Sequence, residues 1–213
     1  LLFLPLLASI ISGFFGKFIG DRNSEIITSI FVSISALLSL ILFYQVIVNG
    51  YANNVVIATW INSGTLDVNW SIKVDALSSV MLVVVTLVSS LVHIYSIGYM
   101  SHDPHKPRFM AYLSLFTFAM LTLVTSDNFL QLFFGWEGVG LCSYFLIGFW
   151  YKKDSANAAA IKAFVVNRVG DFGFALGIFL IFYLFGTVNY SEVFQQIPQI
   201  VDKELLFLGI HIK

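Results

Sequence analysis

Long uncharged stretches separated by short polar segments dominate the pattern of hydrophobic and polar residues in this chain. Crossing about 30 Å of hydrocarbon takes roughly 20 apolar residues in a helix, and six stretches approach or exceed that length. These predicted spans cover approximately residues 1–18, 26–48, 74–97, 109–125, 129–151 and 156–185. The pattern therefore predicts an all-α polytopic membrane protein with about six transmembrane helices.

The segment between the second and third spans has the periodicity of strands. Residues 55–61 and the alternating run 66–72 flank a turn-forming Asn-Ser-Gly-Thr sequence, which predicts a small β-hairpin in the loop 49–73. Trp60 and Trp70 suit either the headgroup level of the bilayer or packing on neighbouring helices.

The last part of the chain changes character after the sixth span. A polar stretch at 189–199 is followed by an apolar run at 205–212. Eight residues are too few to cross a bilayer, so we expect this run to be the truncated start of a seventh helix. The chain is then expected to be a fragment, a truncation or one half of a split polypeptide.

Basic residues lie on one side of the predicted topology. The loops after spans one, three and five hold most of them, whereas the loops after spans two and four hold only Lys73. The basic residues of the first group are Lys17, Arg22, Lys106, Arg108, Lys152 and Lys153. Lys and Arg in short loops favour the cytoplasmic or matrix side, so the N-terminus and the hairpin are expected to face outward.

Composition narrows the classes of function. Hydrophobic residues make up 58% of the chain and charged residues 11%, whereas a soluble domain carries about 25% charged residues. A net charge of -1 gives no field that attracts nucleic acid. Cys142 has no partner for an internal disulfide, and the histidines of the loop 102–105 lack the ligands of a metal site. The bilayer is the expected environment, with no nucleic-acid partner and no metal.

Charges inside the fifth and sixth spans are the main functional signal. Glu137 is the ninth residue of its span, roughly 14 Å deep at about 1.5 Å per residue and therefore near the midplane. Arg168 and Asp171 are three residues apart on one helical face, roughly 18 and 22 Å from the inner end of their span. Each such charge costs at least about 2.5 to 3.5 kcal/mol, so it persists only with partners or water.

These charges predict a proton relay at the midplane. The connection between the two spans is short, which makes them antiparallel neighbours and brings Glu137 toward Arg168 and Asp171. Glu137 would take up and release the proton, its two partners would set its affinity, and Lys162 would lie toward the inner mouth. A static ion network is the alternative, and Lys162 is close enough to the helix start to reach the surface. His93 is a weaker candidate, because a lone histidine there is more often structural.

Glycines in these two spans have a packing interpretation. Gly135, Gly138 and Gly140 look like part of a dinucleotide-binding loop, but no strand precedes them and they lie inside a membrane helix. We expect them to permit close helix packing, as we do for Gly173 and Gly177.

Two runs carry a specific family resemblance. The first is DNFL at 127–130 with GWEGVGLCSY at 135–144 and LIGF at 146–149, and the second is KAFVVNRVGD at 162–171. In these runs the chain resembles the N-terminal part of the distal antiporter-like membrane subunit of respiratory complex I, the NADH dehydrogenase chain 5 family. By this resemblance residues 1–108 form three helices with the hairpin loop, and 109–213 part of a first antiporter-like repeat.

The resemblance implies a subunit that couples quinone reduction elsewhere in NADH:quinone oxidoreductase to proton pumping. Glu137, Arg168, Asp171 and Lys162 match the family's polar network, in which the glutamate pairs with a lysine on a later, broken helix. No cofactor is implied in this chain, because FMN, iron–sulfur clusters and quinone belong to partner subunits. The implied partners are other membrane-arm subunits and the remainder of the same subunit, in a mitochondrial inner or bacterial plasma membrane.

Two other classes share this region of sequence. One is a subunit of a multisubunit cation/proton antiporter or of a membrane-bound hydrogenase, and the other is a non-pumping structural piece of the membrane arm. Cation-dependent transport without quinone would identify the first. Proton pumping that survives loss of the Glu137 carboxylate would identify the second.

Overall fold

Seven helices and two hairpins follow one another in the computed structural model of the chain, which describes residues 1–200, 205–207 and 210–212. The helices are α1 (Phe3–Ile19), α2 (Asp21–Asn49), α3 (Ala76–Tyr99), α4 (Lys106–Val124), α5 (Phe129–Ile147), α6 (Asp154–Phe185) and α7 (Tyr190–Ile200). The strands are β1 (Asn53–Ser63), β2 (Leu66–Val74), β3 (Leu205–Phe207) and β4 (Ile210–Ile212).

The helices α2 to α6 are long and apolar enough to cross a membrane, and α1 is an apolar helix of 17 residues. At about 1.5 Å per residue, α1 is roughly 25 Å long, close to the lower limit for a span. Large apolar side chains such as Phe14, Leu37 and Val169 cover the outside of the bundle, as expected for a surface in lipid. The predicted polytopic fold is confirmed, and the chain is an integral membrane protein.

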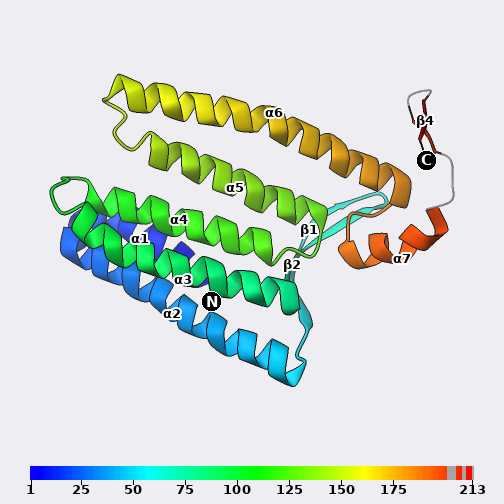
Figure 1. Ribbon diagram of the computed structural model, residues 1–213, viewed down its shortest axis with the longest axis horizontal. Helices are drawn as coiled ribbons and strands as arrows, with labels where there is room; N and C mark the ends of the chain where they lie inside the picture. The colour runs from blue at the N-terminus through cyan, green and yellow to red at the C-terminus, as the bar shows by residue number, and fades with distance from the viewer. Residues whose placement is uncertain (201–204, 208–209, 213) are drawn as a thin grey trace.

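Hydroxyl groups join α2 to α3, beside a hydrophobic cluster centred on Leu2, Leu82 and Leu121. Ser39 Oγ lies 2.7 Å from Thr86 Oγ1, and Ser33 Oγ lies 2.8 Å from Ser90 Oγ, both between α2 and α3. Such small side chains let helix backbones approach closely in a membrane. Helix α4 packs against α1, α2, α3 and α5 and so lies at the centre of the bundle (Figure 1).

Glycines bring α5 onto α4. A Cβ added to Gly135 would lie 2.7 Å from the backbone of Leu123, and one added to Gly138 would also meet an α4 side chain, at 3.0 Å. The predicted packing role is confirmed at these two positions. On α6 it is wrong within the described residues, because an added Cβ at Gly173 or Gly177 has no neighbour within 4 Å.

The hairpin of β1 and β2 is confirmed, with its turn at Gly64 in a positive-φ conformation. Trp60 and Trp70 contact each other edge-on, with ring centroids 5.1 Å apart. Both rings also contact Phe134 of α5, at 5.7 and 4.9 Å. Of the two environments expected for these tryptophans, the structure therefore favours packing on a helix.

The described residues of the run 205–212 do not form the predicted start of a seventh helix. Their described parts, β3 and β4, are short strands paired antiparallel, and residues 208–209 lie outside the described chain. So short a helix is marginal without packing, and Leu, Phe and Ile are compatible with strands. The helix at this end, α7, instead occupies the polar stretch before this run.

Candidate functional site

The depth of Glu137 is set by where α5 begins. Asn128 is the N-cap, and its Oδ1 accepts a hydrogen bond of 2.7 Å from the backbone N–H of Gln131. This cap satisfies a free donor of the first turn. Glu137 follows as the ninth of 19 residues, so it lies near the middle of a helix that spans the membrane.

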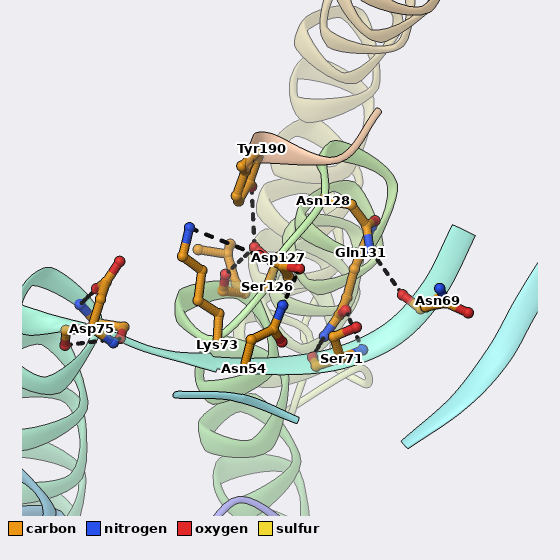
Figure 2. A network of polar contacts seen from close by, with 12 residues as sticks. Asn54, Asn69, Ser71, Lys73, Asp75, Ser126, Asp127, Asn128, Gln131 and Tyr190 are labelled. Atoms are coloured by element: carbon orange, nitrogen blue, oxygen red, sulfur yellow. Dashed lines mark hydrogen bonds and ion pairs between the residues drawn. The ribbon is translucent and has the colours of Figure 1, made fainter. Parts of the chain in front are cut away.

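Side-chain amides tie this end of α5 to the hairpin (Figure 2). Gln131 Oε1 accepts from the N–H of Ser71 at 3.0 Å, and its Nε2 donates to the Ser71 carbonyl at 2.7 Å. Asn128 Nδ2 donates to the carbonyl of Asn69 at 2.9 Å. Gln131 thus pairs with β2 as a neighbouring strand would. The contact made by Gln131 lies less than two helical turns from Glu137.

Charged groups extend the same contact toward α7. Lys73 Nζ lies 3.8 Å from Asp127 Oδ1, and Asp127 also accepts a hydrogen bond from Asn54 (Figure 2). The ammonium group lies 5.4 Å from the ring centroid of Tyr190. Burial raises the pKa of the Tyr190 phenol, so this hydroxyl stays protonated at neutral pH. Polar contacts therefore join the hairpin, the start of α5 and the start of α7 at this end of the bundle.

Glu137, Arg168 and Asp171 form a charged triad between α5 and α6. Arg168 Nη1 donates to Glu137 Oε2 and lies 3.6 Å from Asp171 Oδ2. One guanidinium nitrogen of Arg168 therefore lies within ion-pair distance of both carboxylates. The side chains of Arg168, Glu137 and Asp171 are 43%, 23% and 10% exposed. The pairing expected from the three-residue spacing and from antiparallel neighbours is confirmed as geometry.

Trp136 also contacts the triad, through Asp171. This residue was not identified in the sequence analysis. Its Nε1 donates to Asp171 Oδ1 at 2.8 Å, and its ring meets Phe174 edge-on at 5.9 Å. The available signal was the indole itself, because a tryptophan N–H inside a bilayer needs an acceptor. Asp171 is thus held by an indole on one oxygen and faces a guanidinium with the other.

Lys162 and His93 lie apart from the triad. Lys162 precedes Arg168 by six residues, about 240° around α6 from it, and forms no ion pair with any described residue. His93 is fully buried, with Nδ1 2.7 Å from the Ser89 carbonyl and Nε2 3.0 Å from Ser114 Oγ of α4. In Figure 1 α4 lies between α3 and α5. A role for either residue in proton transfer stays a prediction.

A second buried acid was also missed. Glu25 is 5% exposed, and its Oε1 lies 3.9 Å from Lys106 Nζ. This ion pair joins α2 to the start of α4. The sequence analysis began the second span at residue 26 and left Glu25 in a loop, but α2 begins at Asp21. This pair is at the opposite end of the bundle from the hairpin.

The chemistry available at the triad follows from its charges. It holds one more negative than positive charge in a setting where an unpaired ion is costly. Arginine stays protonated throughout the physiological range. The single guanidinium is therefore shared between two carboxylates.

Comparison with known proteins places these residues in a family. Residues 60–110 match the family model described as NADH-Ubiquinone oxidoreductase (complex I), chain 5 N-terminus, and residues 126–212 match that of NADH:quinone oxidoreductase/Mrp antiporter, TM. The second match contains the whole triad.

Curated relatives agree with the family models. NADH-ubiquinone oxidoreductase chain 5 of Chondrus crispus is 54% identical over 98% of this chain and 31% of its own length. The chain 5 protein of Triticum aestivum is 59% identical over 91% and 29%, respectively. NADH-quinone oxidoreductase subunit L of Rickettsia bellii (strain RML369-C) is 50% identical over 100% and 33%. This chain spans about a third of the length of these relatives.

A solved structure supports the fold. A chain of the membrane-bound sulfane sulfur reductase, an archaeal respiratory membrane complex, aligns with a TM-score of 0.77 over 89% of this chain and 38% of that one. At 19% identity, that likeness concerns the fold alone. The sequence matches, taken with the triad that they contain, show that this chain belongs to the chain 5 family of NADH:quinone oxidoreductase.

Proposed function

We propose that this chain is the N-terminal part of a proton-translocating subunit of NADH:quinone oxidoreductase, in which Glu137 takes up and releases the proton. The observation that carries the proposal is the triad of Glu137, Arg168 and Asp171 between two helices long enough to cross a membrane. Charged residues at such a depth are costly and mark ion pathways. Membership of the chain 5 family supports the same function.

Sharing of Arg168 supplies a physical route for proton exchange. Arg168 Nη1 contacts Glu137 and lies 3.6 Å from Asp171, so its guanidinium is within reach of both carboxylates. When the guanidinium moves toward Asp171, Glu137 loses its counter-ion and binds a proton. Trp136 holds Asp171 in place for this exchange through its 2.8 Å hydrogen bond.

The rest of the reaction is assigned to partner subunits. In this proposal NADH oxidation and quinone reduction occur elsewhere in the complex, on FMN, iron–sulfur clusters and quinone. Other membrane-arm subunits and further parts of the same subunit complete the proton path. Lys162 is proposed to serve the inner mouth of this path.

The orientation follows from the positions of the basic residues. Most of them lie in or next to the turns α1–α2, α3–α4 and α5–α6, which are at the end opposite the hairpin (Figure 1). Under the rule that basic loops stay inside, the N-terminus and the hairpin face outward. We place the protein in a mitochondrial inner or a bacterial plasma membrane.

Cation/proton antiport is the second candidate function, because the family description matched by residues 126–212 includes the Mrp antiporter. In that case the triad would exchange a proton against a metal cation. Transport would then depend on the cation and proceed without quinone.

The test is Glu137→Gln in the full-length subunit within its assembled complex. Glutamine still accepts a hydrogen bond from Arg168 but does not exchange a proton, so we expect NADH-driven acidification to fall by at least about tenfold. The control is Glu192→Gln, the same change in α7, outside the spanning helices. Wild-type pumping by Glu137→Gln would refute the role and favour a static ion network. Quinone-independent, cation-driven proton release by the unchanged protein would favour antiport.

A further inference from the structure

A cavity of about 220 Å³ lies where α4 begins and α5 ends. The polar side chains that line it are Arg108, Tyr112, Tyr144, Tyr151 and Asn157. Each can donate a hydrogen bond, and no carboxylate is among the described residues of the lining. A cavity with donors and a cation but no anion suits an anionic ligand.

Arg108 forms no salt bridge in the described part of the chain. Its Nη2 donates to the carbonyl of Phe149 at 3.1 Å, and its Cζ lies 4.6 and 5.4 Å from the ring centroids of Phe149 and Tyr151. Its Nε is buried and has no hydrogen-bond partner in the described structure. A buried unpaired donor costs free energy, so the packing of Arg108 leaves part of its hydrogen-bonding capacity unused.

The nearby acid is already engaged. Asp103 accepts hydrogen bonds of 2.8 Å from Trp150 Nε1 and from the backbone of His105. Burial acts to raise the pKa of Asp103, but these hydrogen bonds and the charges of His105 and Arg108 lower it overall. Asp103 is therefore an ionised group with hydrogen-bond partners of its own, and it attracts Arg108 without forming a salt bridge with it.

The position of the cavity identifies the source of the anion. Arg108 is the third residue of α4, so it lies within about 3 Å of the helix start, at the level of lipid headgroups. Lys152 and Lys153 follow α5 at the same end of the bundle. Basic pockets between membrane helices on the inner side suit anionic headgroups. Tyr112 stacks on Phe145 at 5.2 Å, which gives the cavity an apolar wall for the start of an acyl chain.

We propose that Arg108, with the tyrosine hydroxyls beside it, binds the phosphate of an anionic phospholipid at the inner face of the membrane. Arg108 would donate through its guanidinium, a group that binds phosphate through charge-assisted hydrogen bonds. The site lies at the end of α5 that the hairpin does not hold, so the lipid would join α4, α5 and α6 there. This proposal rests on the membrane orientation proposed above and is independent of proton transfer.

The test is photo-crosslinking in the full-length subunit, purified in its complex and stripped of loosely bound lipid. The probe is phosphatidylglycerol with a photoreactive acyl chain, and mass spectrometry quantifies labelling of the peptides that cover 106–124 and 144–157. We expect Arg108→Gln to weaken binding by about fivefold or more, as for loss of one cation near a membrane surface. Arg22→Gln, the same change at an exposed inner-side residue, should leave labelling unchanged.

A second variant guards against misfolding. Tyr112→Phe removes one hydroxyl and keeps the stack on Phe145, so it should fold and weaken labelling by about twofold or more. Equal labelling of wild type, Arg108→Gln and Tyr112→Phe would overturn the proposal. Unlabelled phosphatidylglycerol should compete, whereas phosphatidylcholine and millimolar inorganic phosphate should not. Competition by inorganic phosphate as strong as that by the lipid would overturn the assignment to a phospholipid.

Discussion

Replacing Gln131 with methionine tests how the hairpin holds α5. Gln131 is fully buried, and its amide pairs with both backbone groups of Ser71. Methionine has a similar length and volume but no comparable donor or acceptor. The change therefore removes two hydrogen bonds and leaves no large cavity. The Asn128 cap is kept, because it binds the backbone of residue 131.

The magnitude follows from the burial of Ser71, which is 2% exposed. A buried polar group left without its partner costs about 1 to 3 kcal/mol. Two such groups give a loss of roughly 2 to 6 kcal/mol in the free energy that holds β2 to α5. For the Ser71 N–H alone, about 1 to 3 kcal/mol corresponds to amide exchange faster by about 5- to 150-fold.

Hydrogen exchange followed by mass spectrometry measures this effect in the full-length protein, on peptides that cover residues 66–74. Gln45→Met is the matched control, because Gln45 is exposed on α2 away from the hairpin contact. Exchange in β2 should rise in Gln131→Met and stay unchanged in Gln45→Met. A folded Gln131→Met protein with wild-type exchange at Ser71 would refute the reasoning.

Two further changes test the packing of α5. Trp136→Phe removes the indole donor to Asp171 and should cost about 1.5 to 3 kcal/mol, the range for a hydrogen bond to a charged group; a thermal midpoint equal to that of wild type would contradict this contact. Gly135→Ala places a Cβ 2.7 Å from the backbone of Leu123 and should cost about 1 to 3 kcal/mol by overpacking. Gly173→Ala, with open space at its Cβ, should cost nothing in the same unfolding assay, and equal losses in the two alanine variants would count against a clash.

Parts of the site were predictable because they depend on spacing along one helix. Arg168 and Asp171 pair as the three-residue interval requires, and the short turn after α5 brings Glu137 to them. Trp136 was not predictable as a partner of Asp171, because the contact depends on how α5 is rotated against α6. Glu25 was missed because the start of the second span was placed by hydropathy. A charged residue near the end of a helix is then assigned to the preceding loop.

The sequence by itself determined the membrane environment, the apolar helices, the hairpin and the charges at mid-depth. These properties are local, because the cost of charge in lipid and the periods of helix and strand act along the chain. Only the tertiary structure decided that Gln131 pairs with β2, that both carboxylates share one guanidinium nitrogen and that Arg108 faces a cavity without an anion. Such contacts depend on the relative rotation and register of helices, which arise from side-chain packing between segments distant in sequence.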